Sequence, residues 1–160
     1  MPIVEAELIM DGAHTLERCF DVTENTLHAL FRALYQQRVH VEHLVLKASM
    51  AIFGNECEQQ DGVQQVADVT VQCLKRTAPA AVPGIVFLSG GQSAKLATAH
   101  LNTMNAGGAK LPWPLSFSYC RALQAPALKA WKGQPASVPA AQKASFGSYR
   151  AEMEKDALAA

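Results

Sequence analysis

Short apolar runs, separated by longer stretches with helical spacing, are the main pattern along the chain. Runs with strand character lie at residues 2–8, 43–47, 84–89 and 115–119. Each is followed by a stretch in which apolar residues recur at intervals of three and four, which is typical of a helix with one buried face. The pattern therefore predicts four consecutive strand-then-helix units.

The stretches between the runs show where these helices begin and end. In the first stretch, the apolar residues that share one face are Leu16, Phe20, Leu27, Leu30, Phe31 and Leu34. We expect the second helix to begin at Asp61, a capping residue type, and to end before Pro79. The third begins at Ser93 and includes His100 in its apolar stripe. Strands alternating with helices of this length predict parallel βαβ units, with chemistry at the carboxyl ends of the strands.

The last part of the chain contains two residues that disfavour helices. Pro126 within residues 121–131 predicts a single helical turn followed by a restarted helix. Residues 138–158 have a helical composition, and Gly147 predicts a break in that helix. We expect an α/β body at residues 1–145 and a helical tail at residues 146–160.

Composition narrows the class of protein. The 160 residues are 49% hydrophobic, which is enough for one compact domain. Fourteen basic residues balance 14 acidic ones, so no global field attracts nucleic acid or an anionic membrane, and we expect neither partner. The four cysteines contain no C-x-x-C pair, which indicates reduced thiols. No secretory pattern or apolar stretch of about 20 residues is present, so we expect a soluble, cytoplasmic protein.

The first two strand ends supply two carboxylates and a lysine. Lys47 ends an apolar run, and a lysine becomes nucleophilic toward a ketone when its ammonium group is desolvated or lies near another cation. Glu5 and Glu7 are two residues apart, so on a strand they point to the same side, where paired carboxylates suit proton transfer. The alternatives are a lysine that caps a strand with a solvated head and two carboxylates on a solvated face.

The last two strand ends supply the parts of an anion site. Backbone N–H groups of Ser89, Gly90 and Gly91 can approach a phosphate without interference from a Cβ atom. Ser118 and Arg121 add a second donor edge and a fixed positive charge. The alternatives are an ordinary turn and an ordinary surface arginine.

Four motifs together resemble the class I fructose-bisphosphate aldolases. They are "PIVEAELIMDG", "LVLKASM", "GIVFLSGGQS" and "LSFSYCRALQ" with "ALKAW", and the resemblance covers residues 2–145. It implies an α/β fold of the (β/α)8 TIM-barrel type. The chain then corresponds to strands five to eight, the C-terminal half of the barrel.

The resemblance also implies an activity and a role for each candidate residue. Lys47 forms a Schiff base with the ketone, Glu5 transfers protons, and Glu7 orients Glu5. The residues that bind the phosphate of the phosphorylated sugar are Ser89, Gly90, Gly91, Ser118 and Arg121. The implied enzyme is a carbon–carbon lyase of glycolysis and gluconeogenesis that reversibly cleaves fructose 1,6-bisphosphate to dihydroxyacetone phosphate and glyceraldehyde 3-phosphate. It needs no metal or other cofactor, because the iminium is the electron sink.

Four positions depart from the family pattern. Ala6 and Ala48 replace prolines, Ser49 replaces an asparagine, and Cys120 stands where a glycine or other small residue lets phosphate come close. Because Lys47 and Glu5 are retained, we expect weakened substrate binding before lost chemistry.

Half a barrel has consequences of its own. Four parallel strands leave two unpaired edges and an apolar inner face. The partners expected to cover them are a second copy of the chain or a separately encoded N-terminal half, and the third outcome is a gene fragment that folds poorly. Activity is therefore open at this stage. The alternative functions are an inactive truncated aldolase that binds sugar phosphates or assembles with a partner, and a different imine-forming enzyme for another phosphorylated ketose.

Overall fold

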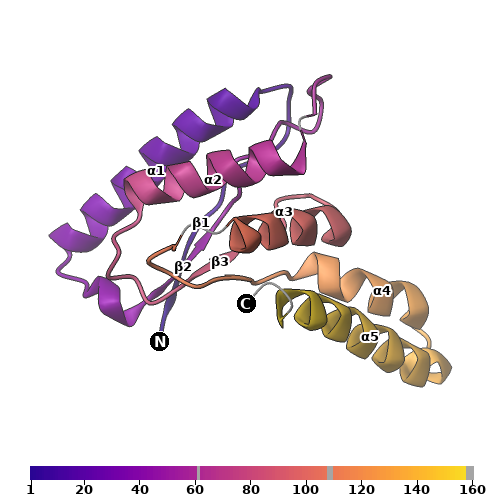
Figure 1. Cartoon of the computed structure of the whole chain (residues 1–160). Coiled ribbons are helices and arrows are strands. Elements are labelled where there is room, and N and C mark those ends of the chain that lie inside the picture. The colour runs from indigo at the N-terminus through magenta and orange to yellow at the C-terminus, as the bar shows by residue number, and fades with distance from the viewer. Residues whose placement is uncertain (61, 108–109, 158–160) are drawn as a thin grey trace.

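The computed structural model describes residues 1–60, 62–107 and 110–157 (Figure 1). It confirms the four predicted strand-then-helix units. The elements are β1 (Ile3–Ala6), α1 (Leu16–Gln36), η1 (Val41–His43), β2 (Val45–Ala48), α2 (Val63–Thr77), β3 (Ile85–Phe87), α3 (Ala94–Ala106), β4 (Leu115–Phe117), α4 (Arg121–Trp131), η2 (Pro135–Ser137) and α5 (Val138–Ala157). Here η marks a short 3-10 helix.

The strands form one parallel sheet in the order β1-β2-β3-β4. Ile3 pairs with Val45, and Leu46 pairs with Ile85, which in turn pairs with Leu115. Within the described part of the chain, β1 and β4 each pair along one side only. The predicted α/β class and parallel βαβ units are confirmed. The described residues form an open sheet and not a closed barrel, and the assignment to strands five to eight stays a prediction.

Successive strand residues point to opposite faces of the sheet. The covered face packs under the helices and consists of Leu46, Ala48, Ile85, Phe87 and Leu115. The open face lies opposite and carries Glu5, Val45, Lys47, Val86 and Ser116, which are exposed or half-buried. Lys47 therefore projects away from the core that its neighbours in β2 help to form.

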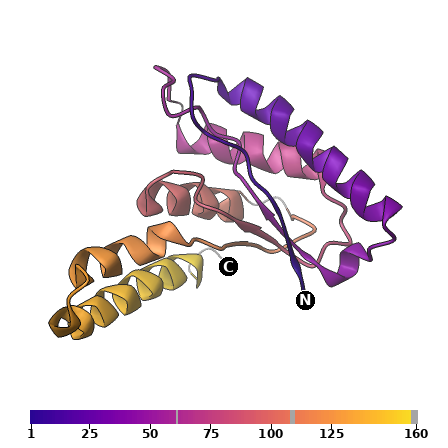
Figure 2. The same cartoon turned by 180° about the vertical axis from the view of Figure 1, so that it is seen from behind.

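Helix α1 covers the sheet through the predicted apolar stripe. Leu16, Leu27 and Phe31 are buried in the core, which confirms the face expected from their spacing. Cys19 and Thr23 are also buried on this face, although the sequence did not indicate them. The Thr23 hydroxyl donates to the Cys19 carbonyl at 2.7 Å, so its burial leaves no donor unsatisfied. Figures 1 and 2 show α1 and α2 side by side over the sheet.

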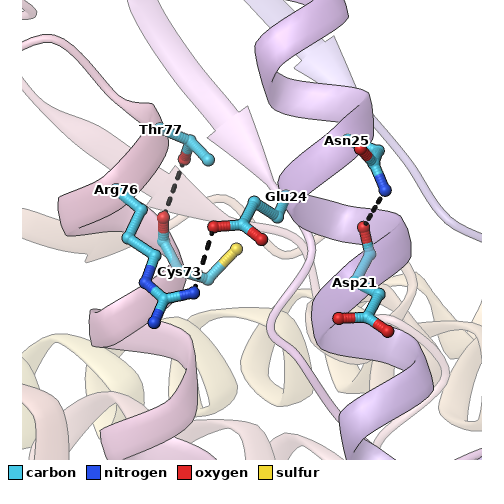
Figure 3. Close-up of polar contacts among 6 residues, drawn as sticks. All are labelled: Asp21, Glu24, Asn25, Cys73, Arg76 and Thr77. Atoms are coloured by element: carbon cyan, nitrogen blue, oxygen red, sulfur yellow. Dashed lines mark hydrogen bonds and ion pairs between the residues drawn. The ribbon is translucent and has the colours of Figure 1, made fainter.

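Polar contacts join the outer surfaces of α1 and α2 (Figure 3). Arg76 Nη1 lies 3.3 Å from Glu24 Oε1, and the guanidinium carbon lies 5.1 Å from the centroid of the Phe20 ring. The Cys73 thiol is buried beneath this pair. Burial, followed by the negative charge of Glu24, raises the pKa of Cys73 to about 12, so the thiol stays neutral at physiological pH.

The boundaries of α2 and α3 follow the sequence closely. The Ser93 side chain accepts the backbone N–H of Leu96 at 3.2 Å, so Ser93 caps α3 as predicted. Helix α2 ends at Thr77, ahead of Pro79 as predicted, but it begins at Val63 with Gly62 rather than Asp61 at the N-cap position. The expected cap of α2, Asp61, lies outside the described residues.

Two predicted helix breaks are wrong. Helix α4 continues from Arg121 to Trp131 through Pro126, and α5 continues from Val138 to Ala157 through Gly147. A proline removes one helical hydrogen bond and a glycine costs about 1 kcal/mol. Most of the neighbouring residues are good helix formers, and α4 and α5 pack against each other along their lengths (Figure 1), which outweighs these local penalties. The proposed division between body and tail at residue 145 falls inside α5 and stays a prediction.

A close backbone contact joins the loops that follow β1 and β2. The N–H of Gly54 donates to the His14 carbonyl at 2.9 Å, and the N–H of Asn55 donates to the Met10 carbonyl at 2.9 Å. A Cβ atom on Gly54 would overlap the carbonyl oxygen of Gly12. The absence of a side chain at position 54 thus allows the two loops to meet, and their meeting fixes the ends of β1 and β2 relative to each other.

Candidate active site

The register of β1 and β2 brings the predicted nucleophile and the predicted proton carrier together. Glu5 is the partner of Lys47 across the parallel ladder, and Lys47 Nζ lies 3.0 Å from Glu5 Oε1. The side chain of Lys47 is 17% exposed and that of Glu5 is 43% exposed, so reactants can reach the amine while its stem is covered. An ammonium must lose a proton before it attacks a carbonyl, and this carboxylate is in position to receive that proton.

Glu7 lies just beyond β1, which ends at Ala6. The next residue, Leu8, donates its N–H to the hydroxyl of Ser49 at 3.2 Å, and this contact fixes the chain after β1 against the chain after β2. Ser49 is only 2% exposed, and this hydrogen bond gives its buried hydroxyl a partner. Glu7 is thus held beside Glu5 by the loop contact rather than by the strand ladder that the sequence predicted.

The glycine pair after β3 forms a tight turn. Gly90 has φ +59° and Gly91 has φ +80°, a region in which residues with a Cβ are strained. The Ser89 carbonyl accepts the N–H of Gln92 at 3.0 Å, which closes the turn. On the neighbouring strand, the N–H of Ser118 donates to the Phe87 carbonyl at 2.8 Å and holds the end of β4 beside this turn. The two predicted halves of the anion site are therefore adjacent.

Seven of the eight candidate residues line one pocket of about 180 Å³. Its lining consists of Glu5, Glu7, Lys47, Leu88, Ser89, Gly90, Ser118, Cys120 and Arg121. Gly91 is the exception, because it lines a wider hollow of about 690 Å³ that extends between α3 and α4. Ser89 and Arg121 belong to both spaces, so the two spaces adjoin. Leu88 is a wall residue that sequence reasoning did not single out.

Sequence reasoning missed a polar group behind the glycine turn. Gln92 Oε1 lies 2.7 Å from His100 Nδ1, and Gln92 Nε2 donates to the Ser89 carbonyl at 3.1 Å. His100 is 3% exposed, and burial lowers the pKa of its ring below the ordinary histidine value. In the sequence, His100 only extended an apolar stripe, so its position on the buried face was the sole available signal.

A metal site is not formed by the part of the chain that the structure describes. There, no group of three His, Cys, Asp or Glu side chains comes together as a metal would require. The described helices also include none that is both long and apolar enough to cross a membrane.

Comparison with known proteins places this pocket in a family. The model of the family described as "Fructose-bisphosphate aldolase class-I" matches residues 1–159. The chain belongs to the class I fructose-bisphosphate aldolase family. The resemblance predicted from the motifs is therefore confirmed, and the residues that line the pocket lie within these motifs.

Individual aldolases show how far this similarity extends. The chain is 59% identical over 131 residues to a probable class 1 aldolase of Xanthomonas axonopodis, which covers 82% of this chain and 39% of the relative. It is 50% identical over 144 residues to aldolase B of Gallus gallus, covering 90% of this chain and 40% of the relative. The solved aldolase of Plasmodium falciparum, in complex with TRAP and a small-molecule inhibitor, is 43% identical with a TM-score of 0.87. The match covers 99% of this chain and 44% of the Plasmodium falciparum chain.

The chain thus spans about two fifths of the length of the curated aldolases that it matches. Its four-stranded parallel sheet corresponds to part of the aldolase barrel. The open face, which bears Lys47, is the face that the interior of a closed barrel would enclose.

Two departures from the aldolase pattern have a visible place in the pocket. Ser49 uses its hydroxyl to accept the N–H of Leu8. Cys120 is exposed on the pocket wall between Ser118 and Arg121. The weaker substrate binding expected from these departures stays a prediction.

Proposed function

We propose that this chain carries the Schiff-base lysine of a class I fructose-bisphosphate aldolase. The reaction is the reversible cleavage of fructose 1,6-bisphosphate to dihydroxyacetone phosphate and glyceraldehyde 3-phosphate, within glycolysis and gluconeogenesis. The observation that supports it is the Lys47–Glu5 pair, 3.0 Å apart, in a pocket that also contains a glycine turn and an arginine.

The proposed chemistry begins at Lys47. Glu5 takes a proton from the ammonium group, and the free amine attacks the ketone carbon to give a carbinolamine. Protonation of the carbinolamine hydroxyl allows water to leave and an iminium to form. The iminium accepts the electron pair of the breaking carbon–carbon bond, while the proton of the hydroxyl on the aldehyde-forming carbon passes to the carboxylate. Glu7, on the same pocket wall, orients Glu5.

The phosphate of the ketone end would lie at the glycine turn. Gly90 and Gly91 present backbone N–H groups without side chains, and Ser89 adds a hydroxyl. Ser118 and Arg121 supply a further donor and a fixed charge from the adjacent strand end. These groups line the same pocket as Lys47 or the adjoining hollow, so one substrate can contact both.

The open face of the sheet requires a covering for the full reaction. In this proposal, the cover is either a second copy of the chain or a complementing N-terminal half, and neither a nucleic acid nor a membrane is a partner. Two observations support a cover: the chain spans about two fifths of the length of its curated relatives, and Glu5 is exposed on the open face. All four cysteines are free, which supports a cytoplasmic, reducing location.

The test is reductive trapping of the imine. The chain is incubated with dihydroxyacetone phosphate and borohydride, digested, and examined by mass spectrometry. We expect a stable adduct on Lys47, reduced labelling in Glu5→Gln, and no adduct in Lys47→Met. Exposed lysines such as Lys75 serve as internal controls. An unmodified Lys47 in the folded wild-type chain would contradict the proposal.

An inactive sugar-phosphate-binding module is the second candidate. The partial coverage of the aldolases favours it, as does the cysteine on the phosphate side of the pocket. This function predicts that calorimetry detects dihydroxyacetone phosphate binding, that Lys47→Met retains it, and that borohydride traps nothing. Trapping on Lys47 would exclude this candidate.

A further inference from the structure

The side chain of Gln92 contacts three separate segments around the pocket. Its Nε2 donates to the Ser89 carbonyl at 3.1 Å and to Met50 Sδ at 3.7 Å, the second being a weak bond because thioether sulfur is a poor acceptor. Its Oε1 lies 2.7 Å from His100 Nδ1. Because Met50 follows Lys47 by three residues, one amide joins the chain after β2, the turn after β3 and helix α3.

The chemistry of these partners determines which atom donates. The Ser89 carbonyl can only accept, so the amide nitrogen of Gln92 must face it and the amide oxygen must face His100. The amide oxygen also only accepts, so the proton of the His100 ring resides on Nδ1. Burial lowers the pKa of His100, so the ring is neutral near physiological pH and carries one proton only. The Ser89 carbonyl therefore sets the orientation of the Gln92 amide, and the Nδ1–H of His100 holds the amide in that orientation.

Among the described residues, the backbone of the glycine turn is only loosely packed on the Gly91 side. Gly90 and Gly91 both have positive φ, and glycine has the largest backbone freedom of any residue. A Cβ placed on Gly91 would meet nothing closer than the Asn55 side chain at 3.9 Å, so packing from that side is loose. The Ser89 carbonyl, by contrast, receives two N–H groups of Gln92, one from its backbone at 3.0 Å and one from its side chain.

We propose that Gln92, held by His100, is a positioning residue that keeps the Ser89–Gly91 turn in register with the segment carrying Lys47. The benefit to an anion rests on the proposed function, because it assumes that phosphate binds the N–H groups of the turn. The restraint on the turn does not rest on the proposed function, because all of the contacts that make it are present in the chain without ligand.

The experiment compares four variants with the wild-type chain. Gln92→Met is close in size and removes all three amide contacts, while His100→Leu removes only the orienting donor. His100→Asn keeps an N–H donor near the place of Nδ1 and is the conservative rescue. Thr77→Val is the matched control, because it removes a buried hydroxyl bond to the Cys73 carbonyl at 2.9 Å on the far side of the fold.

Two measurements are made on each variant: amide hydrogen exchange without ligand at residue 92, whose backbone N–H closes the turn on the Ser89 carbonyl, and binding of inorganic phosphate by calorimetry. In Gln92→Met and His100→Leu, we expect exchange at this amide to accelerate about tenfold or more and phosphate affinity to fall about tenfold. For His100→Asn, we expect the exchange rate and the phosphate affinity to stay within about threefold of the wild-type values. Thr77→Val loses stability but changes neither quantity at the turn.

The outcomes separate this inference from the proposed function. Wild-type chain that binds no phosphate overturns the proposed anion site, and the exchange rates still decide the restraint. Exchange at the turn that is unchanged in Gln92→Met overturns the inference, as does acceleration that is equal in Thr77→Val. If Gln92→Met does not fold, Gln92→Glu replaces it: a carboxylate still accepts from His100 but cannot donate to Ser89, and we expect the same acceleration.

Discussion

The covered and open faces of the sheet use alternate residues of the same strands for different purposes. In β2 and β3, Leu46, Ile85 and Phe87 are fully buried under the helices. Their immediate neighbours Lys47 and Val86 are half-buried on the open face, where the charged pair and the pocket lie. The comparison indicates that the helix layer stabilises the sheet while the other face is left for chemistry, so mutations on the two faces should differ in kind.

The largest expected effect is on the covered face. Phe87→Ala should lower the free energy of unfolding by about 3–5 kcal/mol, because it leaves a cavity in a fully buried layer. Val86→Ala, one residue away on the open face, should cost about 1 kcal/mol. Urea unfolding followed by circular dichroism measures both. Equal losses for the two variants would show that the open face is as well packed as the covered one.

A second effect on the helix side depends on pH. Burial lowers the pKa of His100 in the folded chain, so below about pH 6.5 the unfolded chain binds a proton that the folded chain does not. The free energy of unfolding should therefore fall as the pH drops through the ordinary histidine range, and the loss should level off below the folded pKa. Urea titrations of wild type and His100→Asn at several pH values test this. In the variant, the free energy of unfolding should depend less on pH, because the contribution of His100 is removed.

A smaller effect lies on the outer surface of the helix layer. Arg76→Ala removes the partly exposed ion pair with Glu24 and the contact with the Phe20 ring, and should cost about 1 kcal/mol. Lys75→Ala, its exposed neighbour, is the control and should change stability by less than about 0.5 kcal/mol. High salt should reduce the cost at Arg76, since surface ion pairs are screened.

The smallest stability effect, with the largest chemical one, is expected at Lys47. Lys47→Met exchanges a half-buried ion pair for an apolar side chain of similar length, so unfolding free energy should change by less than about 1 kcal/mol. The same variant should lose all imine trapping. A large loss of stability in Lys47→Met would mean that the pair with Glu5 holds the fold, and the contrast between the two faces would fail.

The sequence predicted the fold and the site where local chemistry carries the signal. Apolar runs located the strands, and because parallel strands end at a common edge, the residues after them could be expected to meet. Glu5 and Lys47 meet through strand register, which two short runs and one connecting helix determine. Ser93 could be recognised as a cap because capping is a contact within one turn of the chain.

Contacts that depend on tertiary packing were outside the reach of the sequence. The bond between Gln92 and His100 crosses from a turn to a helix face and has no periodic signature. Pro126 was expected to interrupt α4, because the packing partner α5 could not be seen from the local residues. Gly91 was assigned to the same pocket as Gly90, whereas successive positive φ angles turn the two glycines toward different spaces.

The contact at Gly54 has an evolutionary consequence. The loops after β1 and β2 are joined there by main-chain atoms, and the bond from Leu8 to the Ser49 hydroxyl joins them a second time. Substitutions at exposed positions of either loop can therefore accumulate without removing the main-chain bonds that set the spacing between the strand ends. Position 54 itself is the exception: any residue larger than glycine would force the two loops apart.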